Sequence, residues 1–157
     1  MIICDSREKK NEHILEYFEI REIPFEVRKL DTGDYMDSDR PRLVIDRKQN
    51  LDELTHNLFS PDKSRFWREV RRAKDEHIKL IFLIEHGGRI KSLTDVRQWR
   101  SRYSKVTGHK LYSEICRVHI AYGCEFFFCS KRSTGKRIVE ILGSDIEWDG
   151  TIQEKNL

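Results

Sequence analysis

Two carboxylates and a lysine lie in the first third of the chain, on either side of a short apolar run. Asp34 follows a glycine in a turn-like stretch, and the β-branched run 43–45 leads directly into Asp46, Arg47 and Lys48. Residues two apart on a strand point to the same side, so Asp46 and Lys48 are predicted to share a face. The turn that carries Asp34 can bring a second carboxylate to that face.

This combination suits the hydrolysis of a phosphodiester bond. Such hydrolysis uses a divalent ion that activates water and neutralises charge on the phosphate, and hard ions such as Mg²⁺ prefer carboxylate oxygens. We therefore predict that Asp46 holds Mg²⁺ or Mn²⁺, that Lys48 reaches the attacking water or the phosphate, and that Asp34 closes the site from the other side. The alternative is an ordinary turn and a solvated strand end, because an acid two residues before a lysine also recurs at residues 8–10.

Several motifs, in the same order along the chain, resemble the nuclease domain of the XPF-type structure-specific endonucleases, a family that includes the Mus and archaeal Hef nucleases. The resemblance covers roughly residues 1–142. The family pattern is Gly-Asp, a spacer, Glu-Arg-Lys, three residues and Asp, with Asp-x-Arg-Glu on the first strand, a basic helix and a strand ending in Leu-Ile-Glu. The matching residues here are Gly33-Asp34-Tyr35, Asp46-Arg47-Lys48, Asp52, Asp5-Ser6-Arg7-Glu8, Ser64-Arg65-Phe66-Trp67 and Leu83-Ile84-Glu85.

The resemblance implies a metal-dependent DNA endonuclease with Asp34 and Asp46 as metal ligands. In that family pattern Arg47 holds the site together or touches phosphate, and Lys48 orients the nucleophile. For Asp5 and Arg7 the alternatives are a turn cap and a surface cation. The catalytic set that the resemblance predicts is Asp34, Asp46, Lys48, Arg47, Asp5, Arg7 and Glu8.

Two features depart from the family pattern. The glutamate of the family is Asp46 here, which is one methylene shorter and affects the expected metal geometry. Family members usually carry a tandem helix-hairpin-helix module after the nuclease domain, and this sequence shows no such module. We therefore expect a stand-alone nuclease domain.

The apolar periodicity predicts alternating strands and helices. Strands are expected at 1–4, 24–30, 43–45, 78–84 and 124–129, and helices at 11–20, 51–58, from Pro61 onward, 93–99, 111–122 and 132–142. This order favours an α/β fold with a central mixed sheet flanked by helices, and the resemblance implies the restriction-endonuclease-like nuclease fold. We expect one domain over residues 1–142 and a polar, loosely held C-terminal tail over residues 143–157.

Two clusters of basic residues are candidates for DNA contacts, because cations neutralise phosphates. The first lies on the helix after Pro61, where salt bridges to neighbouring acids are the alternative. The second lies between residues 89 and 110 beside Trp99 and Tyr103, where the alternative is a solvated face with Trp99 in the core. The predicted DNA-binding residues are Arg65, Arg68, Arg72, Arg97, Arg100, Arg102 and Lys105.

Composition limits the other classes of function. The chain has 30 basic and 27 acidic residues, so any nucleic-acid site must come from local segregation of charge. Its apolar runs are far shorter than a membrane span. We expect a cytoplasmic or nucleoid-associated protein that acts on branched, flap or junction DNA, and the host cell of a phage is one setting that this architecture suits. A homodimer is implied by the family, and an inactive DNA-binding subunit or scaffold is the alternative function.

Overall fold

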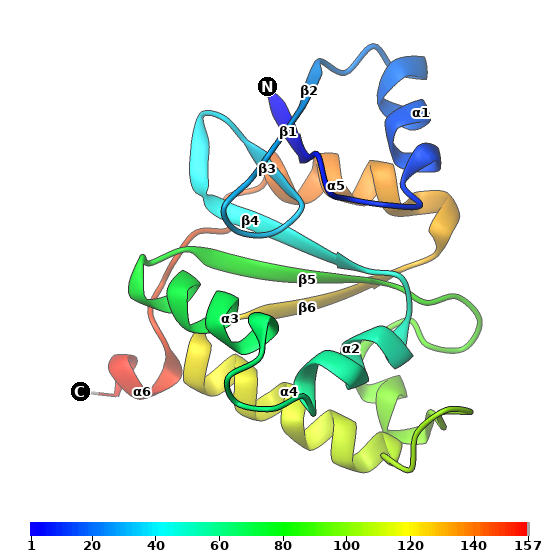
Figure 1. Cartoon of the computed structure of the whole chain (residues 1–157), viewed down its shortest axis with the longest axis vertical. Helices are drawn as coiled ribbons and strands as arrows, with labels where there is room; N and C mark the ends of the chain where they lie inside the picture. The colour runs from blue at the N-terminus through cyan, green and yellow to red at the C-terminus, as the bar shows by residue number, and fades with distance from the viewer. Residues whose placement is uncertain (157) are drawn as a thin grey trace.

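A central mixed sheet crosses the molecule, with helices on both of its faces (Figure 1). The computed structural model describes residues 1–156. The strand order is β2-β1-β3-β4-β5-β6. The strands are β1 (Ile2–Asp5), β2 (Phe25–Arg28), β3 (Tyr35–Asp37), β4 (Arg40–Lys48), β5 (Lys79–Glu85) and β6 (Glu125–Cys129).

The directions of the strands make the sheet mixed. β1 runs parallel to β2 and antiparallel to β3, which is antiparallel to β4. β4, β5 and β6 are all parallel. This confirms the predicted α/β class with a mixed sheet. The structure adds the short strand β3, for which the sequence predicted no strand.

The helices follow the predicted order, with small shifts at their ends. The predicted helix after Pro61 begins later, because Ser64 accepts a hydrogen bond from the amide of Trp67 and so caps the first turn. The helical segments are α1 (Glu12–Ile20), α2 (Leu51–Leu58), α3 (Arg65–Asp75), the 3₁₀ segment η1 (Leu93–Gln98), α4 (Gly108–Tyr122), the 3₁₀ segment η2 (Lys131–Ser133), α5 (Thr134–Leu142) and α6 (Ile152–Lys155).

Two hydrophobic cores lie on opposite faces of the sheet. Leu80, Phe82 and Ile84 of β5 pack with α2, α3 and α4 in one core. Ile81 and Leu83 pack with α1 and α5 in the other. Every residue of β5 is buried, since helices cover both of its faces. Figure 1 shows α2, α3 and α4 grouped in the lower half of the view and α1 and α5 in its upper half.

The expectation of a loosely held C-terminal tail was wrong, because the described part of that segment is packed against the domain. The Arg40 guanidinium donates hydrogen bonds to the carbonyls of Leu142, at 3.0 Å, and Ile146, at 2.6 Å. The Lys79 ammonium lies 3.1 Å from an Asp149 carboxylate oxygen. Thr151 is 1% exposed. The sequence of this segment is polar, but its main-chain carbonyls accept hydrogen bonds from the half-buried Arg40.

No helix within residues 1–156 has the length and the apolar character that crossing a membrane requires.

Candidate active site

Strand β4 divides the predicted catalytic residues between the two faces of the sheet. Val44 packs into the core under α2, α3 and α4, and Ile45 packs into the core under α1 and α5. Successive strand residues point to opposite faces. Asp46 and Lys48 therefore lie on the side of α3, and Arg47 lies on the side of α1 and α5.

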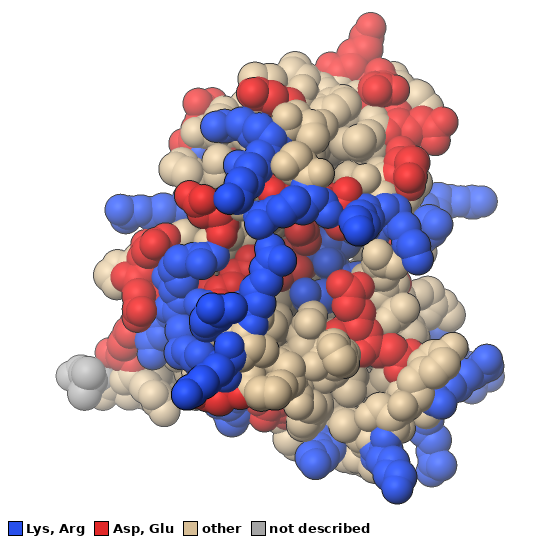
Figure 2. Space-filling model, in the orientation of Figure 1, with Lys and Arg blue, Asp and Glu red and all other residues tan. Residues whose placement is uncertain are grey.

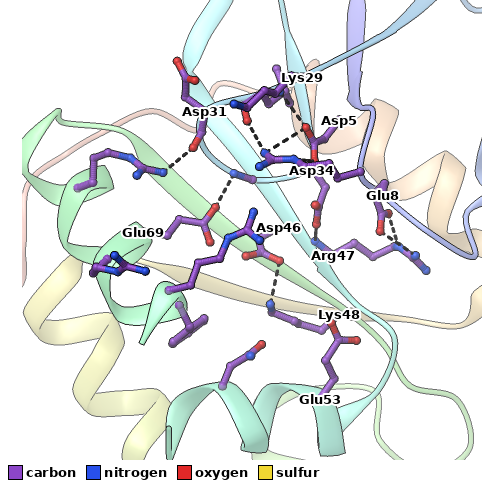
Figure 3. A pocket seen from close by; sticks show the side chains of 18 of the residues that line it. Asp5, Glu8, Lys29, Asp31, Asp34, Asp46, Arg47, Lys48, Glu53 and Glu69 are labelled. Carbon is purple, nitrogen blue, oxygen red and sulfur yellow. Dashed lines mark hydrogen bonds and ion pairs between the residues drawn. The ribbon is translucent and has the colours of Figure 1, made fainter. Parts of the chain in front are cut away.

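Asp34, Asp46 and Lys48 converge on the α3 side of the strand end (Figure 3). The Lys48 ammonium lies 3.1 Å from Asp46 Oδ1. Asp34 comes from the turn before β3, and its Oδ2 accepts a hydrogen bond of 2.8 Å from the backbone N–H of Arg47. The structure thus brings together the three residues that the sequence spacing singled out. We call Asp34, Asp46 and Lys48 the acidic centre.

The turn that carries Asp34 is held by its main chain on both sides. The Asp34 N–H donates to the carbonyl of Ile45 at 2.8 Å, and the Asp34 carbonyl accepts from the N–H of Asp5 at 2.7 Å. Gly33 has φ +69°, and a Cβ there would lie 2.9 Å from the Ile45 carbonyl oxygen. Glycine is therefore required beside Asp34 on both conformational and steric grounds.

The crowding of negative charge changes the protonation of the site. Burial raises the pKa of Asp34 well above its ordinary value, and the nearby charges of Asp46 and Glu8 raise it further. Burial alone would lower the pKa of Lys48, but Asp46, Glu53 and Asp34 outweigh that effect and raise it. Lys48 is therefore a cation at neutral pH, and it is suited to orienting a water or a phosphate rather than to accepting a proton.

Arg47, on the opposite face, is the centre of a buried ion-pair network. Its Nε lies 2.7 Å from a Glu8 oxygen, and its Nη1 lies 3.1 Å from a Glu85 oxygen. The three side chains are 1%, 9% and 5% exposed. Glu85 also accepts from the Thr134 hydroxyl at 2.8 Å and lies 3.0 Å from His13 Nε2. This network joins β4 and β5 to the first residues of α1 and to the first residues of α5. Arg47 therefore holds these elements of the site together.

Asp5 and Arg7 support the neighbouring loop. Asp5 Oδ1 accepts a hydrogen bond of 2.8 Å from the Leu30 N–H. The Arg7 guanidinium lies 3.1 Å from Asp5 Oδ2 and donates to the Leu30 carbonyl at 2.7 Å. Arg7 is about half exposed, whereas Asp5 is buried. The pair fixes the segment that precedes the Asp34 turn and leaves the edge of the guanidinium accessible.

A cleft of about 760 Å³ opens over the acidic centre. All seven residues predicted for catalysis line it. Basic side chains of α3 form one wall, and Figure 2 shows Lys and Arg side chains around a hollow in which acidic atoms are visible. The predicted DNA-binding residues that line this cleft are Arg65, Arg68 and Arg72. The Arg72 guanidinium donates hydrogen bonds to Thr32 Oγ1 and to the carbonyl of Asp31.

The second basic cluster lies away from the cleft. Its side chains are exposed, with Arg97 on η1 and the other three on the segment that follows it. Trp99 is partly buried against the core of α2, α3 and α4. This agrees with the alternative of a solvated face with Trp99 in the core. A separate cavity of about 500 Å³ lies between Trp99 and the start of α4. The residues of the cluster that line this cavity are Arg97, Arg100 and Lys105, and Arg102 lies between them in sequence.

Glu69 also lines the cleft. The sequence indicated for it only a salt bridge to the basic residues of the same helix. Its Oε1 accepts a hydrogen bond of 2.7 Å from the Gly33 N–H. Burial and the charge of Asp46 raise the pKa of Glu69 to about 7. Its spacing could have identified it, since Glu69 lies four residues after Arg65 and three before Arg72, on one face of α3.

The acidic centre fits a hydrated divalent ion. Within residues 1–156 no three or more His, Cys, Asp or Glu side chains are placed to form a metal cage. Mg²⁺, however, commonly takes only one or two protein carboxylates and keeps several waters. The repulsion that Asp46 exerts on the buried Asp34 is the electrostatic condition that a cation would relieve. Asp34 and Asp46 would hold the ion, with their oxygens as its hard donors.

The mixed six-stranded sheet with helices on both faces is a restriction-endonuclease-like fold. The family model of the ERCC4 domain matches residues 4–142. The chain therefore belongs to the ERCC4-domain family, the family of the XPF-type structure-specific endonucleases.

Two solved structures are similar to this chain. XPF from Aeropyrum pernix matches with a TM-score of 0.67 and 18% identity, over 90% of this chain and 62% of that one. XPF from Aeropyrum pernix in complex with DNA matches with a TM-score of 0.66 and 20% identity, over 94% of this chain and 69% of that one. At these identities the likeness establishes the fold. Among curated proteins, no sequence matches this chain significantly.

Replacing Arg47 tests its structural role. Arg47→Ala leaves Glu8 and Glu85 buried without their cation, so we expect a loss of about 3–5 kcal/mol in the free energy of unfolding. Urea denaturation followed by circular dichroism measures this loss. Arg42→Ala is the matched control, because Arg42 is exposed on the same strand, and it should change stability by less than ~0.5 kcal/mol. A loss below ~1 kcal/mol for Arg47→Ala would contradict the assigned role.

The raised pKa values of Asp34 and Glu69 predict the pH dependence of stability without divalent ions. Both carboxyls bind protons more tightly in the folded chain than in the unfolded chain. Their contribution to stability is therefore greatest at low pH and is lost as pH rises from their ordinary pKa values through about 7 for Glu69. Thermal unfolding with chelator at pH 5 to 8 should show this decline. The decline should be smaller in the Asp34→Asn/Glu69→Gln double variant, and an unchanged decline would refute the prediction.

Proposed function

We propose that this protein is a metal-dependent DNA endonuclease that hydrolyses phosphodiester bonds in branched, flap or junction DNA. The observation that carries the proposal is the convergence of Asp34, Asp46 and Lys48 under a cleft wall of arginines. A protein that only bound DNA would have no need of two repelling carboxylates beside a buried lysine at the floor of its basic cleft. Membership of the ERCC4-domain family supports the same reading.

The side chains of the acidic centre divide the chemistry among them. Mg²⁺ or Mn²⁺ bound by Asp34 and Asp46 would supply an activated water and neutralise charge on the phosphate. Lys48, held as a cation by Asp46 at 3.1 Å, orients the attacking water or a phosphate oxygen. Its ammonium lies over the ring of Phe66, 5.4 Å from the ring centroid. This aromatic floor limits the directions that Lys48 can take.

The basic wall of the cleft places the DNA backbone. Arg65 and Arg68 are exposed and line the cleft one helical turn apart, beside the acidic centre. Cations at this position neutralise phosphates and bring the scissile bond to the carboxylates, which would otherwise repel it. The second basic cluster is a further contact, with another part of the DNA, since none of its exposed side chains lines the cleft.

The wider role follows from the family and remains part of the proposal. We place the activity in recombination, repair or replication, in the cytoplasm or at the nucleoid, including that of a phage-infected cell. The family usually pairs its nuclease domains, so we also propose a homodimer. XPF from Aeropyrum pernix has been solved in complex with DNA, which supports DNA as the partner.

Substitutions in the acidic centre test the chemistry. Asp46→Ala, Asp34→Asn and Lys48→Ala each remove one electrostatic element of the transition state, so we expect cleavage to fall by at least about a hundredfold. Labelled flap, fork, four-way-junction and duplex DNA, incubated with Mg²⁺, Mn²⁺ or chelator, provide the measurement. Asp39→Asn, at an exposed turn, should cut like the unsubstituted protein. Full activity of Asp46→Ala would exclude the mechanism, and DNA binding without cleavage by the unsubstituted protein would support an inactive subunit.

Salt dependence of binding tests the basic wall. In an Asp46→Ala background, Arg65→Gln/Arg68→Gln should weaken duplex binding and reduce the slope of log affinity against log salt by ~1.8, or ~0.9 for each lost phosphate contact. Fluorescence anisotropy at several salt concentrations measures the slope. Arg28→Gln/Arg42→Gln removes two exposed strand arginines that do not line the cleft, and it should leave the slope nearly unchanged. Equal effects of the two pairs would rule out a specific role for α3.

A further inference from the structure

Glu69 is a third carboxylate beside the two proposed metal ligands. Burial of Phe66, Trp67 and Val70 fixes the rotation of α3 and so turns Glu69 toward the cleft. Figure 3 shows its carboxylate directed between the Gly33 turn and Asp46. It comes from a helix, whereas the two aspartates come from a turn and a strand.

One oxygen of Glu69 has a defined partner. Oε1 accepts the Gly33 N–H at 2.7 Å, and this bond joins α3 to the turn that carries Asp34. The N–H of Asp34 itself is used by the Ile45 carbonyl at 2.8 Å. The turn is therefore held from two sides, by β4 through Asp34 and by α3 through Gly33. The position of the Asp34 carboxylate depends on both bonds.

The other side of the Glu69 carboxyl group faces Asp46. Asp46 is one methylene shorter than the glutamate that the family pattern has at this position, so its oxygens stay closer to the strand. Lys48 already engages Asp46 Oδ1 at 3.1 Å. A glutamate at position 46 would extend its negative charge further into the cleft. Here Glu69 supplies that charge from the other side of the cleft.

We propose that Glu69 is a positioning residue for the divalent ion, which fixes the Asp34 turn through Gly33 and supplies beside Asp46 the negative charge that the shorter side chain cannot extend. This inference rests on the proposed function. The three carboxylates do not form a ready-made three-ligand cage, so Glu69 acts through Asp46 and through its charge on the hydrated ion. Removal of such outer partners of metal ligands costs about 10- to 100-fold in metal affinity.

Mn²⁺ binding to the full chain tests this inference without any DNA. Electron paramagnetic resonance of free Mn²⁺ at pH 8 gives the affinity of each variant. Glu69→Gln keeps an oxygen acceptor for the Gly33 N–H and removes only the charge, so it should weaken Mn²⁺ binding about 10- to 100-fold without lowering the melting temperature in chelator. Glu76→Gln, an exposed glutamate seven residues further along the same cleft wall, should bind Mn²⁺ normally.

A second substitution tests whether Glu69 compensates for the short Asp46. Asp46→Glu, introduced into Glu69→Gln, should restore most of the lost Mn²⁺ affinity, because the longer side chain returns the charge to the cleft. Unchanged affinity in Glu69→Gln, or no rescue by Asp46→Glu, would overturn the inference. The proposed function is judged separately, by Mn²⁺ binding to the unsubstituted chain and its loss in Asp46→Ala. That result would still hold if Glu69→Gln left the affinity unchanged or if Asp46→Glu gave no rescue.

Discussion

The ion pair of Arg47 with Glu8 and Glu85 is the constraint on which the rest of the site depends. Arg47 is 1% exposed and engages both carboxylates on the α1 and α5 side of the sheet. A buried cation with two acids can be tolerated only if its geometry is fixed. Fixing Arg47 also fixes the rotation of the last residues of β4, and so it directs Asp46 and Lys48 to the opposite face. One face of the strand end is therefore structural, and the other is left for chemistry.

The chemical face carries an excess of negative charge that the fold itself only partly neutralises. Lys48 offsets Asp46, and the N–H of Arg47 offsets Asp34. Burial, together with the remaining repulsion from Asp46, raises the pKa of both Asp34 and Glu69. Such groups are typical of functional sites, where folding stability is given up for a charge arrangement that a ligand completes. The arginines of α3 stand further out, where they attract phosphate without neutralising the carboxylates below.

The sequence alone was sufficient for the class of fold, the order of the elements and the acidic centre, because those depend on local periodicity and on motifs with fixed spacing. Strand β3 was missed, since three residues are too few to show alternation. The spacing of Glu69 places it on one face of α3 with Arg65 and Arg72, but it gives no sign of the contact with Gly33, 36 residues away. The packed C-terminal segment was missed for a similar reason. A polar stretch gives no sign that a distant Arg40 will bind its carbonyls.

The attachment of the C-terminal segment also sets directions in the molecule. Arg40 and Lys79, which hold that segment, begin β4 and β5, whereas Asp46 and Lys48 lie where β4 ends. Nine strand residues at ~3.3 Å each put these two ends roughly 25–30 Å apart. The C-terminal segment is therefore anchored at the end of these two strands that lies opposite Asp46 and Lys48.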